Sequence, residues 1–543
     1  MRGINNFFVD WEKIILRDGA ELFIKNETSY KEYDFLIGEL NDLGYKTEIE
    51  RFEGDVKFLF LKKDKETLYT SYTPQEERIR IIKKLNGELY LNENYVSSVK
   101  TTPLITQVKL SYFSVDCGMC YIIRLSDGKF VIIDSGIGEY EEDEHIFELL
   151  KEQSPEFEKP IIAAWFLSHA HEDHFGAFIS FINKYREDIY LENLIYNWEK
   201  IGDLDITDFE KTLETIKADT KIIIARTGQS FRFSDCVFDL LFTGEDLYPQ
   251  EICNLNDTSL IMRMDLSGHR VLWLGDAMNQ SSDYICSRYD ERSFKCEFLQ
   301  VGHHGYAGGS EQLYKWANPE ILLWPCPDFW YPVVKEWKPN EILLNSKNMR
   351  QNLISGQQEI VIDLTKPISD FKPYTTFKNG ETIYYENFHN KRVIDLGWSC
   401  ITGGNTGYSP LDIVVNEREC NLTAKDVFSV CELVKLGQIK ANPDFTFKIS
   451  GVSKSNTGEF GMFWNYDSPT VFNEDKIIWF KNTEEGNFEY TFSSDFAKKQ
   501  MILYFYDKEV CEFTYDKMFP LCLVMKNCCI ELKELKLVNG TLK

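Results

Sequence analysis

Three histidines and an aspartate with ligand-forming side chains fall within six residues, in the run Ser168-His169-Ala170-His171-Glu172-Asp173-His174. The whole chain has only eight histidines, so three of them in one short segment are a strong signal. Imidazole nitrogens and carboxylate oxygens are the usual ligands of catalytic zinc. Because His169 and His171 alternate, both can reach one cation, while Asp173 and His174 face a second position. We therefore predict a metal centre with one or two Zn²⁺ ions, or with Mn²⁺ or Fe in their place.

Strands and helices must hold these ligands in place. The apolar run at residues 161–167 is typical of a strand covered on both faces, and residues 175–185 have a helical pattern. Two later strand-like runs also end in polar residues. One leads to Gly275-Asp276, and the other leads to Gly302-His303-His304-Gly305. We expect Asp276 and a histidine of the last segment to gather around the same cation.

This pattern resembles the HxHxDH signature of the metallo-β-lactamase superfamily. Residues 131–136, Val-Ile-Ile-Asp-Ser-Gly, are similar to its first motif, so the resemblance gives Asp134 a structural role beside the metal loop. It makes Asp276 the carboxylate that bridges two metals. In the last motif one histidine completes the second metal site. By analogy with the Gly-His-Gly form of this motif that ligand is His304, and His303 is either a substrate-facing acid or a group that supports the ligands from behind. The spacing alone leaves the choice between the two histidines open.

The His-His-Gly form is that of the branch containing the competence-type nuclease domains and the phosphorylcholine esterases. The segment Asn254-Leu-Asn-Asp-Thr-Ser-Leu-Ile261 is similar to the same branch. The resemblance covers about residues 106–370 and implies metal-dependent hydrolysis of a phosphodiester or phosphomonoester, rather than of a β-lactam or thioester. It also implies that Asp173 orients the attacking hydroxide and accepts its proton. His303 or Tyr306 would then protonate the leaving group.

One histidine of the family's usual ligand set is absent. The only histidine between His174 and His303 is His269, which is expected in an exposed hairpin turn. Water, substrate or an amide oxygen could take the vacant place, and the side-chain candidates are Asn197, Asn254, Asn256 and Asp257. A mononuclear site of Asp173, His174 and His304 is the alternative. The absence also supports a second hypothesis, a non-catalytic protein that keeps a structural metal and binds a carbohydrate or a partner through its C-terminal part.

An aromatic cluster follows the last of these motifs. Its members are Trp324, Phe329, Trp330 and Tyr331. We interpret the cluster as core packing, with a pocket wall that stacks on a base, a sugar or an organic cation as the alternative.

The patterns along the 543 residues predict an α+β protein with three domains. Residues 1–105 are predicted as a small α/β module, residues 106–375 as a metallo-β-lactamase αββα sandwich, and residues 376–543 as an all-β, jelly-roll-like sandwich. Within the last domain we expect one short helix at residues 426–436 and a β-bulge at Lys533-Glu534, where the alternation of the closing strand slips by one residue. We interpret residues 395–405 as a packed Trp398 followed by a Gly-rich turn, with a sugar site at Trp398 as the alternative.

The composition limits the classes of partner that we expect for this protein. The net charge of −26 repels phosphate backbones, so broad nucleic-acid binding is not expected, whereas a small phosphorylated substrate at a metal remains compatible. The first residues lack the apolar run of about 7–15 residues of a signal peptide. No window approaches about 18 apolar residues, so no membrane span is expected. The fourteen cysteines then favour a reducing compartment, the cytoplasm. The oligomeric state is open.

Overall fold

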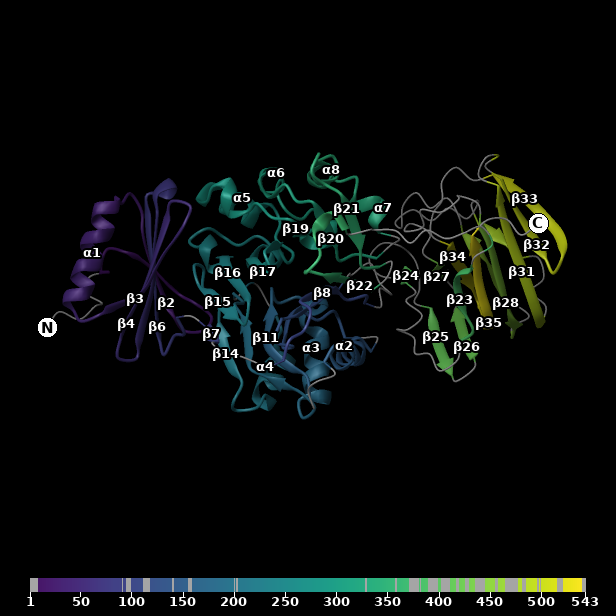
Figure 1. Cartoon of the computed structure of the whole chain (residues 1–543), viewed down its shortest axis with the longest axis horizontal. Helices are drawn as coiled ribbons and strands as arrows, with labels where there is room; N and C mark the ends of the chain where they lie inside the picture. Colours follow the sequence, from purple (N-terminus) through teal and green to yellow (C-terminus); the bar gives the residue numbers. More distant parts are fainter. Residues whose placement is uncertain are drawn as a thin grey trace.

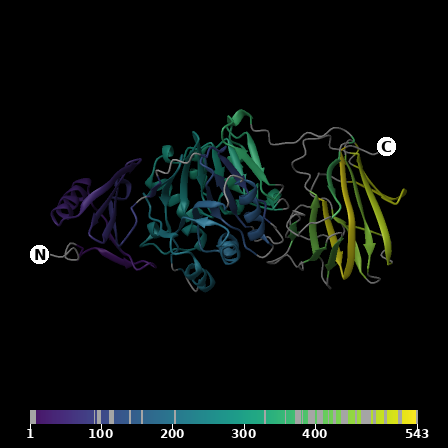
Figure 2. The ribbon, with the colours of Figure 1, turned by 60° about the horizontal axis from the view of Figure 1, so that its bottom comes forward.

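A computed structural model describes residues 8–370 apart from 90, 94–98, 111–117, 139–140, 155–158, 200, 202–203, 328–329 and 357–358. Beyond these it describes 380, 382–388, 399–401, 411–416, 419–424, 429–434, 445–454, 458–463, 477–480, 485–495, 498, 500–514 and 521–539. Three groups of sheets follow one another along the long axis (Figures 1 and 2). The predicted α+β fold class is confirmed, with an αββα sandwich in the middle group.

The N-terminal group is one antiparallel sheet and one helix. Helix α1 (Tyr30–Asp42) begins with a capping box, in which Ser29 and Glu32 satisfy each other's backbone N–H groups. The sheet has the order β1-β2-β6-β5-β4-β3. Its strands are β1 (Glu12–Ile15), β2 (Glu21–Lys25), β3 (Lys46–Glu53), β4 (Val56–Lys63), β5 (Glu66–Thr73) and β6 (Arg78–Leu85).

The middle group contains two eight-stranded sheets. The first has the order β14-β13-β11-β10-β9-β8-β22, with β12 beside β11. Its strands are β8 (Leu104–Gln107), β9 (Cys120–Arg124), β10 (Phe130–Asp134), β11 (Ile161–Leu167), β12 (Tyr190–Leu191), β13 (Asn193–Tyr196), β14 (Lys221–Ile224) and β22 (Ile360–Asp363). The helices that follow these strands are α2 (Glu142–Glu152), α3 (Glu172–Tyr185) and α4 (Thr207–Thr215). Strands β10, β11, β13 and β14 run parallel, so their carboxyl ends lie at one edge.

The second sheet has the order β21-β20-β19-β18-β17-β16-β15-β7. Its strands are β7 (Leu91–Glu93), β15 (Ser230–Phe233), β16 (Cys236–Phe242), β17 (Ile261–Leu266), β18 (His269–Trp273), β19 (Phe298–Gln300), β20 (Ile321–Trp324) and β21 (Gln351–Ile354). Its helices are α5 (Asn279–Arg288), α6 (Glu311–Ala317), α7 (Tyr331–Val334) and α8 (Lys338–Leu344). Strands β7 and β8 therefore pair within the middle sheets, whereas the N-terminal sheet ends at Leu85. The predicted boundary at residue 105 remains a prediction.

Alternation along β10 shows how the four layers form. Val131 and Ile133 belong to a buried cluster that also contains Phe238 and Trp273 of the second sheet. Phe130 and Ile132 belong to a different cluster, which includes residues of α2 and α3. Successive side chains of a strand point to opposite faces. The strand is thus apolar throughout because one face meets the other sheet and the other face meets helices.

The C-terminal group is a sandwich of two antiparallel sheets with an apolar cluster between them. One has the order β25-β26-β35-β28-β31-β32-β33 with β23 beside β35, and the other has the order β24-β27-β34-β29-β30. The strands are β23 (Thr382–Glu386), β24 (Ser399–Ile401), β25 (Asp412–Asn416), β26 (Glu419–Ala424), β27 (Ser429–Val434), β28 (Phe445–Ser453), β29 (Glu459–Phe463), β30 (Ile477–Trp479), β31 (Gly486–Asp495), β32 (Gln500–Phe505), β33 (Lys508–Thr514), β34 (Leu521–Lys526) and β35 (Cys528–Asn539).

Two local predictions in this sandwich have opposite outcomes. The helix expected at residues 426–436 is wrong, because Ser429–Val434 form β27, which pairs with β24 and β34. The bulge is confirmed, because Ser450 pairs with Glu534 and Gly451 with Leu532, which leaves Lys533 without an opposite residue. The candidate sugar-binding residue Trp398 and the loop after residue 401 lie outside the described residues. None of the helices described is long and apolar enough to cross a membrane.

Candidate metal centre

The HxHxDH segment lies where β11 ends and α3 begins. His171 caps the helix in an extended conformation, and Glu172 opens it. Gly176, in the first turn of α3, lies against the backbone of Ile137, and a Cβ atom at Gly176 would be 1.9 Å from the Ile137 carbonyl oxygen. Only glycine allows this approach. The helix is therefore seated closely against the loop that follows β10, and its first turn presents Asp173 and His174 to the site.

Asp134, at the end of β10, holds the metal loop from behind. Its Oδ1 accepts a hydrogen bond from the Ser168 backbone N–H at 2.7 Å, and its Oδ2 accepts from the Ser168 hydroxyl at 2.7 Å. Oδ2 also lies 2.7 Å from His174 Nδ1. Asp134 is fully buried. These contacts orient the His174 ring so that Nε2 faces away from Asp134, as a carboxylate partner does for metal-bound histidines.

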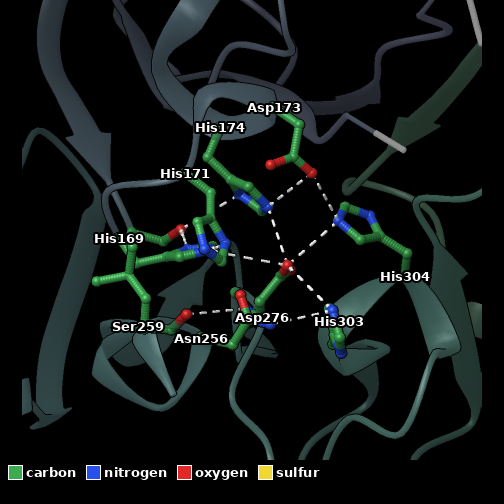
Figure 3. A network of polar contacts seen from close by, with 12 residues as sticks. His169, His171, Asp173, His174, Asn256, Ser259, Asp276, His303 and His304 are labelled. Carbon is green, nitrogen blue, oxygen red and sulfur yellow. Dashed lines mark hydrogen bonds and ion pairs between the residues drawn. The ribbon is translucent and has the colours of Figure 1, made fainter. Parts of the chain in front are cut away.

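Asp276 lies at the centre of the cluster, beyond the end of β18. Its backbone N–H donates to the Ser259 hydroxyl at 2.9 Å. Its Oδ2 is 3.1 Å from His174 Nε2, 3.3 Å from His304 Nε2 and 3.8 Å from His169 Nε2 (Figure 3). One carboxylate oxygen thus contacts histidines from two separate segments of the chain.

His303 and His304 lie in the left-handed region, with φ of 48° and 54°. His304 Nδ1 is 2.8 Å from the Pro325 carbonyl oxygen, which can only accept, so Nδ1 donates and Nε2 faces the cluster. His304 Nε2 is 3.2 Å from Asp173 Oδ2. His303 Nε2 is 4.0 Å from Asp276 Oδ2 and 3.1 Å from Asn256 Nδ2. The structure therefore brings His304 among the ligand atoms and places His303 beside them.

The six predicted ligands form two groups that share Asp276. In each group the ligand atoms lie within 4.8 Å of one another. One group contains His169, His171 and Asp276, and the other contains Asp173, His174, Asp276 and His304. Within the first, His169 Nε2 and His171 Nδ1 are 2.9 Å apart.

The cluster fits a divalent cation by its donor set and by its unsatisfied atoms. His174 Nε2, His304 Nε2 and Asp276 Oδ1 are buried and make no well-aligned hydrogen bond within the described residues. The nearest carboxylate oxygens lie 3.1 Å from His174 Nε2 and 3.2 Å from His304 Nε2. Buried polar atoms are normally paired, and leaving them unpaired costs free energy. Imidazole with carboxylate is the donor set of zinc and related ions. Cations at the two groups would satisfy all three atoms.

Charge couples the members of the cluster. Burial opposes ionisation of Asp276, but His174 and His304 outweigh it and hold the pKa of Asp276 well below its usual range. Burial opposes protonation of His304, but Asp276 and Asp173 raise its pKa to about 9. Burial lowers the pKa of His169. Burial also opposes protonation of His174, but Asp276, Asp173 and Asp134 raise its pKa, so metal binding would displace protons from the cluster.

Of the residues considered for the place of the absent histidine, only Asn256 reaches the cluster. Asn254 caps the turn by accepting from the Asn256 N–H at 2.9 Å. Asp257 accepts from the Met278 and Ser281 backbone N–H groups. Asn197 donates to Ala225 O and to Glu245. His269 starts β18, at the opposite end of that strand from Asp276.

The predicted acid Tyr306 lies at the edge of the site. It is 42% exposed, and its ring centroid is 5.6 Å from that of His303 and 4.3 Å from that of Trp337. Trp324 is a core residue that donates its indole N–H to Asn352. Trp330 is mostly buried and stacks on Tyr306 at 6.0 Å. Phe329 lies outside the described residues. Aromatic side chains therefore flank the site, with Tyr306 the exposed one.

Two serines that support the ligands were not singled out from the sequence. Ser168 bonds Asp134 and lies 3.1 Å from His169 Nδ1, and Ser259 holds the Asp276 backbone. The sequence offered only their positions as a signal, since Ser168 directly precedes the first histidine and Ser259 lies in the Asn-rich segment. Small hydroxyl residues are common at such positions.

The sequence comparison agrees with this geometry. Residues 116–225 match the family model of the metallo-beta-lactamase superfamily. The predicted resemblance to that superfamily is thus confirmed over these residues. The match and the metal-type cluster together support a metal-dependent hydrolase. No curated protein matches the sequence.

Similar solved structures include human tRNase Z, short form, at 12% identity and TM-score 0.25, over 40% of this chain and 90% of that one. A galectin-like protein from Bacillus subtilis has 8% identity and TM-score 0.21, over 31% of this chain and 99% of that one. A sialidase has 12% identity and TM-score 0.21, over 30% of this chain and only 18% of the sialidase.

Proposed function

We propose that this protein is a hydrolase that cleaves a phosphodiester or phosphomonoester with water at a two-cation centre. The observation that carries the proposal is the position of Asp276 Oδ2, 3.1–3.8 Å from three histidine nitrogens of two ligand groups. A carboxylate shared in this way suits a pair of ions. His169, His171 and Asp276 would hold one ion, and Asp173, His174, Asp276 and His304 would hold the other. Zn²⁺ fits both donor sets best, with Mn²⁺ and Fe as alternatives.

Bound cations would supply a water of near-neutral pKa and would polarise a phosphoryl oxygen. The remaining steps belong to side chains of the chain. Asp173 is the most accessible carboxylate of the cluster, since its side chain is 19% exposed against 3% for Asp276. It can therefore orient the attacking water and take up a proton. Its Oδ2 lies 3.2 Å from His304 Nε2, which keeps the carboxylate in place.

The phosphorus substrate rests on the His-His-Gly and Asn-rich segments, which the structure brings into contact. His303 Nε2 and Asn256 Nδ2 are 3.1 Å apart, and Figure 3 shows His303 and His304 on one side of Asp276 and His169 and His171 on the other. Preorganised polar groups at such a place can receive the charge that develops on a phosphoryl oxygen. We assign His303 to the leaving group, and Tyr306, farther out, to the wall of the substrate site.

The test is hydrolysis of bis(p-nitrophenyl) phosphate and p-nitrophenyl phosphate by the full chain, together with its metal content. Asp276→Ala should lower kcat/KM at least about 100-fold and reduce the bound metal, because loss of a shared ligand exceeds the usual effect of residues behind the ligands. Asp265→Asn is the matched control. Asp265 pairs with Arg270 on the β17–β18 hairpin, away from the cluster, and its loss should leave both readouts unchanged.

An Asp276→Ala protein that hydrolyses the phosphodiester as fast as the parent would overturn the proposal. One bound metal and no turnover of either ester would favour the alternative, a protein that keeps a structural metal and binds a carbohydrate or a partner through its C-terminal sandwich.

A further inference from the structure

A cavity lies at the edge of the first middle sheet that also carries the metal cluster, beyond the carboxyl ends of β13 and β14. It has a volume of about 210 Å³ and contains none of the residues of the metal cluster. Its lining includes the aromatic side chains of Tyr196, Trp198 and Phe209, and the polar side chains of Glu199 and Arg226. That space is well above the ~10–15 Å³ that a single water needs, so the cavity admits a small molecule.

Glu199 is a buried carboxyl group that makes no direct ion pair with the residues that the structure describes. It is 2% exposed, and its polar partner among the residues described is the Tyr248 hydroxyl, 3.2 Å from Oε2. The nearby Arg226 is already engaged, at 2.5 Å from Asp18 Oδ2 and 3.2 Å from Glu245 Oε2. A buried carboxylate is costly unless it takes a proton or meets a positive charge. The free cavity therefore presents a carboxyl group that either keeps a proton or requires a positive charge beside it.

The rest of the cavity wall is largely aromatic. The Trp198 ring packs at 4.3 Å from Phe209 and 5.1 Å from Tyr196. Such rings form an apolar surface that also tolerates a positive charge.

From these groups we infer that the cavity binds a small organic ammonium, with the ammonium on Glu199 and the carbon chain along the aromatic wall. The site is distinct from the metal centre and does not depend on the hydrolysis proposed above. The two are adjacent, because Trp198 packs at 5.1 Å from Phe175, the residue after His174.

The test compares 5-amino-1-pentanol with 1,5-pentanediol, which has the same number of non-hydrogen atoms and no charge. Binding to the full chain is measured by ligand-detected NMR titration. We expect the amino alcohol to bind at least ten-fold more tightly than the diol. Glu199→Gln should remove that difference, because it keeps the shape and removes the charge. Glu210→Gln, the same change at the exposed rim where Glu210 meets Arg17 at 3.3 Å, should retain it.

A second readout uses the unaltered protein, in case Glu199→Gln fails to fold. Burial raises the pKa of Glu199 to about 8, and the negative charges of Glu245 and Asp18 act in the same direction. Arg226 and the Tyr248 hydroxyl lower this pKa but do not outweigh the burial. At pH 6.5 the free carboxyl is protonated, so an incoming ammonium should release up to one proton, seen by calorimetry in two buffers. Equal binding of amine and diol, an unchanged preference in folded Glu199→Gln, or binding without proton release would each overturn the inference.

Discussion

Replacing Asp134 with asparagine should weaken metal binding without touching a metal ligand. The two carboxylate oxygens of Asp134 meet three groups at 2.7 Å, namely the Ser168 N–H, the Ser168 hydroxyl and His174 Nδ1. Asparagine keeps one acceptor oxygen, which can still serve the Ser168 N–H. Its amide nitrogen would then present N–H groups towards the hydroxyl and the imidazole. His174 would lose the partner that keeps Nδ1 protonated and Nε2 available.

The size of the effect can be worked from the lost contact. A hydrogen bond to a charged group contributes about 1.5–3 kcal/mol. At ~1.4 kcal/mol for each factor of ten, this corresponds to roughly 10–100-fold in affinity. The same range is typical when a carboxylate behind a metal-bound histidine is removed. We therefore expect about 10–100-fold weaker binding of the ion that His174 helps to hold.

The assay is competition for Zn²⁺ against a chromophoric chelator, which resolves the affinity of each ion. Asp127→Asn is the matched control, because Asp127 is also buried and lies at the other end of β10, where it accepts from the Lys129 N–H at 3.1 Å. Unchanged affinities in folded Asp134→Asn would refute the role given to Asp134. An equal loss in Asp127→Asn would show that the effect comes from the sheet and not from His174.

Two further predictions concern stability. Gly176→Ala should lower the free energy of unfolding in urea by about 1–3 kcal/mol, because the added Cβ would meet the Ile137 carbonyl. Gly38→Ala in α1 has open space around it and should raise the free energy of unfolding by about 0.5–1 kcal/mol. Equal effects of the two substitutions would contradict the close approach at Gly176. Because the pKa of Glu199 is raised from 4.5 to about 8, its contribution to stability is present below pH 4.5 and is lost as the pH rises towards 8. The free energy of unfolding should fall by at most about 1.4 kcal/mol per pH unit over this range. The Glu199→Gln protein should not show this fall, and the same pH dependence of stability in both proteins would contradict the prediction.

Much of the middle group follows from its pattern. The apolar run at residues 161–167 forms β11 with the same bounds. A strand covered on both faces is apolar at every position, so the first polar residue marks its end. The polar residues after β10, β11 and β18 lie together because these strand ends meet at one edge of the sandwich. The helix at residues 426–436 was wrong because a short apolar segment has no fixed period, and pairing with β24 and β34 decides its conformation.

Other features depend on contacts that no local pattern encodes. Asn256 reaches His303 only because Asn254 and Asp257 fix its turn against the start of α5. The cavity at Glu199 forms where Asp18 of the β1–β2 turn meets Arg226 after β14, more than two hundred residues away in the chain. The burial of the Glu199 carboxyl group therefore cannot be predicted from the local sequence around it.

The pair His303-His304 shows why spacing left two ligands as alternatives. In an extended segment, neighbouring side chains point to opposite sides, so only one of the two could face the cluster. Here both residues are left-handed, and both imidazoles face Asp276, at 4.0 Å and 3.3 Å. Such a conformation costs on the order of 1–3 kcal/mol per residue and persists only where the surroundings impose it. Asn340 donates to the Gly305 carbonyl at 2.6 Å, and Pro325 accepts from His304, so packing behind the loop imposes it. The conformation therefore allows one histidine to join the ligands while its neighbour faces the substrate side.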